Sequence, residues 1–222
     1  MKILVVSAHP DDEIIGCGGT LLKHKSNGDE IAWVIVTNIS ESDGFSYEQV
    51  ASRQIEIETI KNSLGIEVIH LLNYPTMQLD DTLLNEMIPR IATIFKNYAP
   101  EIIYLLNRSD AHSDHRITFD AVIACTKSFR HPYIKRVLMY ECISETEFAP
   151  ALPEKVFIPN YFVDISIFFQ EKLKLLTVYH SELGEHPFPR SLRNIEALAV
   201  FRGASVGVEY AEAFQLLKYI DK

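Results

Sequence analysis

The chain has 222 residues and a formal net charge of −9, and 47% of its residues are hydrophobic. This composition is ordinary for a globular protein with a core of useful size, and it argues against disorder. The sequence contains no Lys/Arg cluster. Nucleic-acid binding is therefore disfavoured as the main role of the protein, and so is membrane binding through a basic surface helix.

The first half of the chain alternates between apolar strands and helices. In chain order, the pattern predicts a strand at 2–8, a helix at 14–28, a strand at 30–38, a helix at 46–65, a strand at 66–72, a helix within 79–100, a strand at 101–107 and a helix from about 115 to 128. Strands that are apolar throughout and alternate with helices are typical of a parallel sheet covered on both faces.

The second half is less regular. The pattern predicts strands at 136–143 and 160–166, a loop at 144–160, and helices at 168–181, 190–202 and 209–220. No linker rich in Gly, Pro or Ser divides the chain. We therefore predict a single domain over 1–222 with an α/β fold, a Rossmann-like three-layer sandwich around a mostly parallel central sheet.

The cysteines and the N-terminus bear on the cellular compartment. Cys17, Cys125 and Cys142 lie far apart, which favours small buried side chains in a reducing compartment over a disulfide or metal role. The first apolar run is too short for a signal peptide, and carboxylates follow it at once. No run of about 18 apolar residues predicts a membrane span. We expect a cytoplasmic protein.

The sequence AHPDDE at 8–13 directly follows the first predicted strand. Ligands of open parallel sheets bind beyond the carboxyl ends of the strands. Adjacent carboxylates repel one another and are costly to desolvate unless a cation lies beside them. His9 and Asp12 offer one nitrogen and one oxygen across a turn stiffened by Pro10, which suits a zinc-like ion. Asp11 could then act on a metal-bound water.

The motif AHPDDE and the glycines after it have two other interpretations. Three acidic residues also suit the solvated N-terminus of a helix, where the helix dipole favours negative charge. The sequence GCGG at 16–19 could suggest a dinucleotide site, but its glycines follow the acids and do not form a G-x-G-x-x-G turn. A pyrophosphate would also be repelled by the carboxylates. We interpret the glycines as positions of close helix packing.

A second cluster follows the fourth predicted strand. The sequence NRSDAHSDHRITFDA at 107–121 places His112, Asp114 and His115 just past the end of that strand. One histidine from this cluster would give the metal two histidines and one carboxylate. The fourth position is then left for water, which is the pattern of catalytic zinc. The two motifs together predict a metal-dependent hydrolytic site.

The motifs AHPDDE at 8–13 and HSDH at 112–115 strongly resemble those of the zinc-dependent N-deacetylases of the PIG-L/LmbE-like family. The segments 52–65, 179–183 and 201–214 also resemble parts of that family, so the likeness spans most of the chain. Its members remove acyl groups, usually acetyl, from N-acetylglucosamine-type sugars and related conjugates.

The resemblance implies a role for each residue of the two motifs. It implies a zinc site, for which iron(II) is the alternative metal, made of His9, Asp12 and His115. It implies that Asp11 is the general base, and that His112 is the general acid or stabilises the oxyanion. It also implies that Asp114 orients a histidine without binding the metal.

Substrate contacts are expected from Arg53 and Asp110. Arg53 matches the helix arginine that contacts substrate in relatives, although a surface arginine paired with Glu56 is the alternative. The helix reads SRQIE at 52–56, where many members carry a doubled arginine and a doubled glutamate. Asp110 stands where some sugar-thiol relatives have a tyrosine. Both departures concern the substrate and not the chemistry.

The preferred function is a zinc-dependent hydrolase that removes an N-acetyl or other N-acyl group from an N-acetylglucosamine-type sugar or sugar conjugate. A metal-dependent phosphoesterase is an alternative, because Asp/His clusters also serve phosphoryl transfer. A non-catalytic metal- or nucleotide-binding module is another. His180 and His186 of the segment 180–190 could line the cleft, but for both of them and for Glu182 a structural or surface role is favoured. The sequence leaves the oligomeric state open, a homo-oligomer included.

Overall fold

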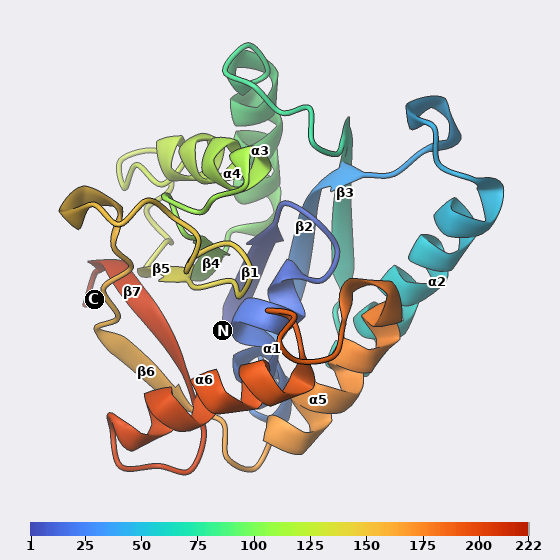
Figure 1. The fold of residues 1–222 in the computed structure, drawn as a ribbon. Coiled ribbons are helices and arrows are strands. Elements are labelled where there is room, and N and C mark those ends of the chain that lie inside the picture. The colour runs from blue at the N-terminus through green and yellow to red at the C-terminus, as the bar shows by residue number, and fades with distance from the viewer. Residues whose placement is uncertain (222) are drawn as a thin grey trace.

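The computed structural model describes residues 1–221, and in them the apolar runs form a seven-stranded sheet (Figure 1). The strands are β1 Lys2–Ser7, β2 Glu30–Asn38, β3 Val68–Pro75, β4 Ile102–Leu106, β5 Arg136–Tyr140, β6 Tyr161–Asp164 and β7 Ala211–Tyr219. The helices are α1 Asp12–Ser26, α2 Tyr47–Leu64, α3 Leu84–Tyr98, α4 Ser113–Ala124, α5 Phe169–Leu176 and α6 Leu192–Ala204. Short 3-10 turns are η1 Glu41–Asp43, η2 Pro153–Lys155 and η3 Thr177–Glu182.

The strand order is β3-β2-β1-β4-β5-β7-β6. Strands β1 to β5 are parallel, and β7 and β6 add an antiparallel edge. The chain adds β2 and β3 on one side of β1 and then β4 on the other side, so the strand order reverses between the parallel neighbours β1 and β4. Such a switch point opens a crevice beyond the carboxyl ends of the two strands. The first and second sequence motifs therefore meet there.

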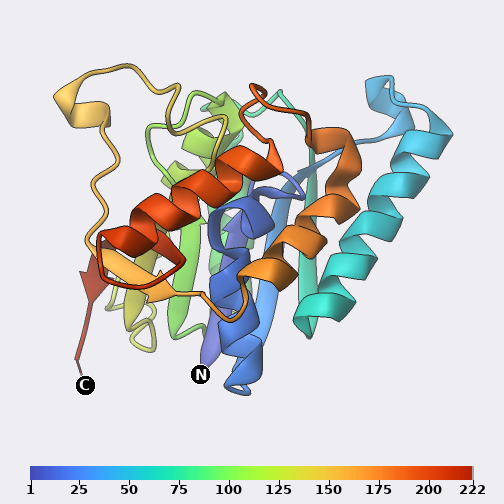
Figure 2. The same ribbon diagram turned by 60° about the horizontal axis from the view of Figure 1, so that its bottom comes forward.

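Helices cover both faces of the sheet, which confirms the predicted three-layer α/β fold (Figure 2). Helices α3 and α4 lie on one face, and α1, α2, α5 and α6 lie on the other. Alternate residues of β1 serve the two cores, since Ile3 and Val5 belong to one and Leu4 and Val6 to the other. All four side chains are fully buried, as expected of a strand inside a parallel sheet.

The predicted helix at 209–220 is wrong, because this segment forms β7. The sequence EYAEAFQLLKYI is rich in Ala, Glu, Leu and Lys, which are good helix formers. Pairing with β5 on one side and β6 on the other overrides that local preference. Long-range pairing of this kind leaves only a weak signal in the local sequence.

Helix α1 is interrupted at Cys17, where φ is −145° and ψ is 20°. The second part of the helix is capped by Glu212 of β7, whose carboxylate accepts the Gly19 and Thr20 backbone N–H groups at 2.8 and 2.7 Å. The Lys172 ammonium of α5 donates to the same carboxylate at 2.7 Å. This buried cluster ties α1 to α5 and β7.

The glycines of α1 allow close packing, as predicted, but against neighbouring side chains and not against neighbouring backbone. A Cβ atom at Gly16 would lie 2.2 Å from the Tyr140 ring, and one at Gly19 would lie 2.8 Å from Ile165. The predicted helix 168–181 is also modified, because α5 ends at Leu176 and continues as η3, with Tyr179 in a non-helical conformation. Every helix within residues 1–221 is too short or too polar to span a membrane.

Candidate metal centre and active site

The first motif forms a tight turn between β1 and α1. Asp11 has a φ of 138° and a ψ of −32°, a conformation that residues other than glycine rarely adopt. The Asp11 carbonyl accepts the N–H groups of Ile14 and Ile15, which begins the helix. The Asp12 carboxylate accepts the His9 backbone N–H at 2.8 Å. The turn thus places His9, Asp11 and Asp12 at the crevice.

The second motif completes a metal-binding arrangement across that crevice. The ligand atoms of His9, Asp12 and His115 all lie within 4.8 Å of one another. The His115 Nε2 atom is 3.3 Å from Asp12 Oδ1, and the His9 Nδ1 atom is 3.8 Å from Asp12 Oδ2. Two imidazole nitrogens and one carboxylate form a donor set that suits zinc or iron(II).

A carboxylate holds the outward nitrogen of each of these histidines. Asp110 Oδ2 lies 2.9 Å from His115 Nδ1, and Asp114 Oδ2 lies 3.0 Å from His9 Nε2. With a proton on each of these outer nitrogens, the inner nitrogen of each ring is left as an acceptor facing Asp12. Paired carboxylate and histidine side chains of this kind fix the tautomer and the ring orientation in metal sites.

Asp110 and Asp114 are fully buried and lie outside the cavity wall. Asp110 also accepts hydrogen bonds from Asn107 Nδ2 and Thr146 Oγ1, both at 2.7 Å. Its side chain lies behind His115, so the substrate contact predicted from the sequence has no support in this geometry. The contact of Asp110 is with the outer nitrogen of His115.

A second group of ligand atoms, those of His9, His112 and Asp114, also lies within 4.8 Å. It shares His9 with the first group. The Asp114 carboxylate already accepts the backbone N–H groups of Met77 at 2.7 Å and Leu79 at 3.2 Å, in addition to its contact with His9. The oxygens of Asp114 are therefore more fully engaged than those of Asp12, which makes the first group the stronger candidate for an ion.

The electrostatics of Asp12 and His115 also fit a cation. Burial alone would lower the pKa of His115, but the charges of Asp12 and Asp110 and their hydrogen bonds raise it well above its usual value. Burial alone would raise the pKa of Asp12, but the charges of His115 and His9 and their hydrogen bonds lower it. The pair therefore holds a proton on His115 opposite an ionised Asp12, and a metal ion would replace that proton.

The neighbouring carboxyl groups have the opposite tendency. Burial, followed by the charge of Asp12, raises the pKa of Asp11 well above its ordinary value. Burial raises the pKa of Glu13 to about 8. Asp11 faces the cavity, whereas the Glu13 side chain is fully buried beneath the turn. Adjacent carboxyl groups thus differ sharply in proton affinity.

His112 lies beside the metal ligands, with its ring centroid 4.6 Å from that of His9 and 5.4 Å from that of His115. Its Nδ1 atom accepts the Asp114 backbone N–H at 3.1 Å. Burial, followed by the charges of the neighbouring histidines, lowers the pKa of His112 to about 4. The lowered pKa favours a neutral ring, and because Nδ1 is the acceptor, the proton of that ring is on Nε2.

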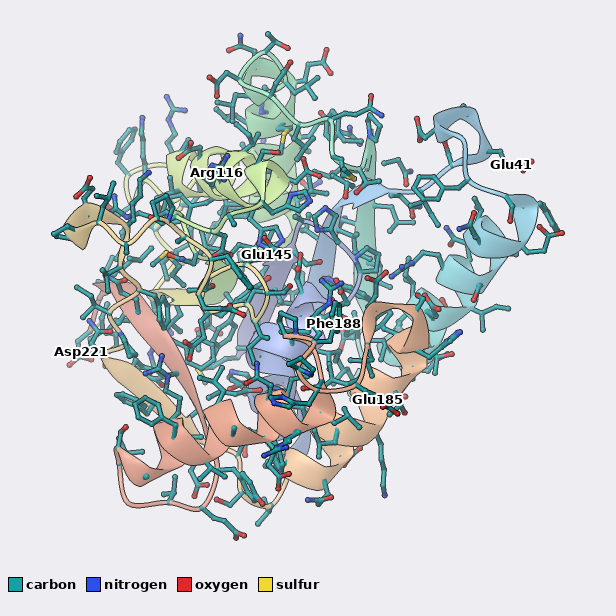
Figure 3. The ribbon with its side chains drawn as sticks, viewed as in Figure 1. Glu41, Arg116, Glu145, Glu185, Phe188 and Asp221 are labelled. Carbon is teal, nitrogen blue, oxygen red and sulfur yellow. The ribbon has the colours of Figure 1, made fainter. Side chains whose placement is uncertain are left out.

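A cavity of about 670 Å³ lies above these residues. Its walls come from the loop after β2, from α2, from the loops after β3 and β5, and from the segment between α5 and α6. The wall residues include Asn38, Ile39, Phe45, Glu48, Gln49, Arg53, Glu56, Thr76, Met77, Cys142, Glu145, His180, Glu182 and Arg190. Figure 3 marks two of the surrounding loops, since Glu145 follows β5 and Phe188 precedes α6.

Comparison with known families shows which family has this pair of motifs. Residues 4–126, more than half of the chain, match the family described as PIG-L, GlcNAc-PI de-N-acetylase. The matched region contains both motifs. The chain belongs to the PIG-L family. The family resemblance predicted from the sequence, and with it the expectation of a deacetylase-type hydrolase, is confirmed.

Individual relatives agree with this assignment. The diacetylchitobiose deacetylase of Thermococcus kodakarensis is 26% identical over 223 residues, which cover 97% of this chain and 83% of that protein. The N,N'-diacetylchitobiose deacetylase of Pyrococcus horikoshii is 25% identical, with a TM-score of 0.77 over 98% of this chain and 84% of that one. GalB, the 4-carboxy-2-hydroxymuconate hydratase of Pseudomonas putida, shares the fold at 18% identity and a TM-score of 0.73 over 100% and 98%. The fold alone therefore does not fix the reaction.

Arg53 of this PIG-L family chain lies in the cavity wall, and its side chain is only 13% exposed. It forms the ion pair with Glu56 that the sequence suggested, at 3.3 Å. It also donates to the Pro10 carbonyl at 2.9 Å and to Glu182 Oε1 at 2.6 Å. The alternative of a surface arginine therefore does not describe its environment, and Arg53 is placed where it could contact a ligand.

His180 and Glu182 both line the cavity of this PIG-L family chain. The sequence allows His180 and His186 to line the cleft but favours a structural or surface role for them and for Glu182. Glu182 lies between Arg53 and Arg190, and Arg190 donates to it at 3.2 Å. The signals for this wall are the family likeness of 179–183 and the Pro-rich segment 180–190, in which Arg190 was not singled out.

Proposed function

We propose that this protein is a zinc-dependent N-deacetylase that releases acetate from an N-acetylglucosamine-type sugar or a conjugate of such a sugar. The observation that carries the proposal is the convergence of His9, Asp12 and His115 at the base of a cavity that Asp11 and His112 also line. Membership of the PIG-L family supports the reaction, and the diacetylchitobiose deacetylases among the relatives support the sugar.

The proposed metal ligands fit zinc in number, chemistry and support. His9, Asp12 and His115 supply three protein ligands, as is usual in catalytic zinc sites that keep one position open. Asp110 and Asp114 hold the two histidines in the required tautomers. When bound, the metal would polarise the amide carbonyl and make a water molecule acidic enough to lose a proton near neutral pH.

Asp11 and His112 transfer protons and stabilise the charge that develops in the reaction. Asp11 accepts a proton from the attacking water, and its raised pKa, caused mainly by burial, makes its carboxylate a stronger base than an ordinary aspartate. His112 donates its Nε2–H to the oxyanion that develops on the amide oxygen. Because His112 is neutral and its Nδ1 is engaged, the proton gained by Asp11 is the one that passes to the leaving amine. Acetate and a free amino sugar result.

The cavity suits an uncharged substrate with a second unit attached. Ile39, Phe45 and Met77 line the cavity and could carry the apolar face of a sugar ring or another part of a conjugate. The charged lining residues are of both signs, and Glu182 is paired with Arg53 and Arg190. A phosphoesterase usually needs a second metal site. Within residues 1–221 the two ligand groups share His9, so this structure favours one ion and an amide hydrolase.

Metal analysis combined with acetate release tests the proposal. The purified protein should contain about one zinc per chain. It should release acetate from N-acetylglucosamine, diacetylchitobiose or a related conjugate, and chelation should abolish the release. Asp12→Ala and His115→Ala should lose the metal. Full activity in metal-free protein would exclude the proposed chemistry. Bound zinc without hydrolysis of any N-acetyl sugar would instead favour a non-catalytic metal-binding module.

A further inference from the structure

The peptide unit between Pro10 and Asp11 is held at both of its polar groups by side chains. Arg53 of α2 donates from Nη1 to the Pro10 carbonyl at 2.9 Å. Glu13 of α1 accepts the Asp11 N–H at its Oε2 atom, at 3.1 Å. This peptide unit leads into the strained conformation of Asp11, where φ is 138°. Strained conformations persist only when their surroundings determine them, and they cluster at functional sites.

Tyr179 of η3 connects the two side chains that hold this peptide. Its hydroxyl donates to Glu13 Oε1 at 2.9 Å, so both oxygens of the Glu13 carboxyl group are held by hydrogen bonds. The Arg53 guanidinium carbon lies 5.7 Å from the centroid of the Tyr179 ring. Glu13 and Tyr179 are almost completely buried, and neither lines the cavity. The three side chains therefore form a closed set of contacts beneath the Pro10–Asp11 peptide.

We propose that Glu13, Tyr179 and Arg53 form a clamp on the Pro10–Asp11 peptide that aims the Asp11 carboxylate at the attacking water. Glu13 and Tyr179 are positioning residues, because they act through Asp11 and touch no substrate. The clamp rests on the proposed function, which makes Asp11 the general base. It extends that function to residues of α1 and η3 that lie below the active site.

The clamp is separate from the metal ligands. Asp12 is fixed by its own bond to the His9 backbone N–H, and His115 is fixed by Asp110. Loss of the Glu13 carboxylate would leave the Asp11 N–H without a partner and allow the peptide to rotate toward an ordinary conformation. The Asp11 side chain would then move while the ligands stay in place. A general base displaced by about 1 Å can lose about a hundredfold in rate.

Substitutions at Glu13 test the clamp directly. Glu13→Ala should lower kcat about a hundredfold, with KM and metal content unchanged. Glu13→Gln should recover kcat to within about threefold of the parent, because the amide oxygen can accept the Asp11 N–H and the amide nitrogen can donate to the Tyr179 oxygen. A merely structural role for Glu13 would not produce this pattern of a kcat loss at constant KM with rescue by glutamine.

Tyr179→Phe keeps the ring and removes only the hydroxyl, so it guards against a Glu13 variant that does not fold. It should lower kcat about tenfold at unchanged KM, a smaller effect because the Asp11 N–H bond remains. Tyr104→Phe is the matched control. Tyr104 is also a buried tyrosine, and its hydroxyl contacts His24 Nε2 at 2.9 Å in the last turns of α1, away from the site. This control should keep the kcat of the parent.

A crystal structure of Glu13→Ala gives a readout that needs no activity. The clamp predicts that Asp11 leaves the region of positive φ while His9, Asp12 and His115 keep their places. The clamp is overturned if φ of Asp11 is unchanged in that crystal, if metal-loaded Glu13→Ala keeps kcat within twofold of the parent, or if glutamine is no better than alanine. A parent protein that releases no acetate refutes the proposed function instead, and the Asp11 backbone in the crystal still decides the clamp.

Discussion

Asp11 and Asp12 are neighbours in sequence but occupy opposite electrostatic environments. The Asp12 carboxylate faces His9 and His115, whose charges and hydrogen bonds lower its pKa against the effect of burial. At Asp11, burial and the charges of Asp12 and Glu182 raise the pKa and outweigh the opposing charge of Arg190. Pairs of acids whose surroundings separate their pKa values commonly divide the roles of a reaction. Here the division assigns Asp12 to the metal and Asp11 to the proton.

Asp11→Asn tests this division of roles. The amide cannot accept the proton of water, so kcat should fall by about a hundredfold or more. The metal should stay, because Asp11 is not a ligand in this arrangement. Steady-state kinetics and metal analysis on the same sample measure both quantities. Asp81→Asn, which changes an exposed carboxylate, is the control. Loss of metal from Asp11→Asn would show that Asp11 belongs to the ligand set.

Asp110 offers a second test at the scale of one residue. Its carboxylate lies 2.9 Å from His115 Nδ1 and outside the cavity wall. Asp110→Ala should therefore weaken zinc binding by about 10- to 100-fold, as loss of such a partner usually does. KM of the zinc-saturated variant should stay near that of the parent. Competition with a chelator measures the affinity. A raised KM at unchanged zinc affinity would instead support the substrate contact predicted from the sequence.

Among the structural elements, α1, α5 and β7 depend on one buried ion pair. Glu212 of β7 caps the second part of α1 and also binds Lys172 of α5, whose ammonium donates to the Ile15 carbonyl at 2.9 Å. Both side chains of the pair are about 4% exposed. Removing one partner of such a pair leaves an uncompensated charge in the interior. The pair therefore holds in place the helix that begins with Asp12.

Glu212→Gln should lower the free energy of unfolding by about 3–5 kcal/mol, because Lys172 loses its counter-charge. Lys172→Met should be destabilising as well. The double variant should be less destabilised than the sum of the two, because neither charge is then left alone. Urea denaturation of the parent and the three variants measures this cycle. Additive effects within about 0.5 kcal/mol would show that the two side chains act independently.

At the scale of the whole molecule, the local sequence pattern predicts the strands and helices of the first half of the chain better than those of the second half. The predicted strands and helices up to about residue 128 are present. Strand β3 begins two residues and ends three residues later than predicted. His9, Asp12 and His115 could be found because each motif sits at the end of a strand. The wall formed by Glu182 and Arg190 could not, because it exists only after α5 and α6 pack on the sheet. The prediction for the β7 segment failed for the same reason, because this segment becomes a strand only by pairing with β5 and β6.

Metal binding should stabilise the whole fold, because it neutralises acidic groups that folding brings together. The ligands come from the loops after β1 and β4, which are joined only in the folded chain, so the metal binds the native state in preference to the unfolded one. A free zinc concentration of about 100 times Kd adds about 2.7 kcal/mol to the stability. For a chain of this size the increase corresponds to a rise in Tm of roughly 5–10 °C. Calorimetry with and without zinc measures it, and His115→Ala should lose most of the rise. An equal rise in parent and variant would show that zinc stabilises the protein at some other place.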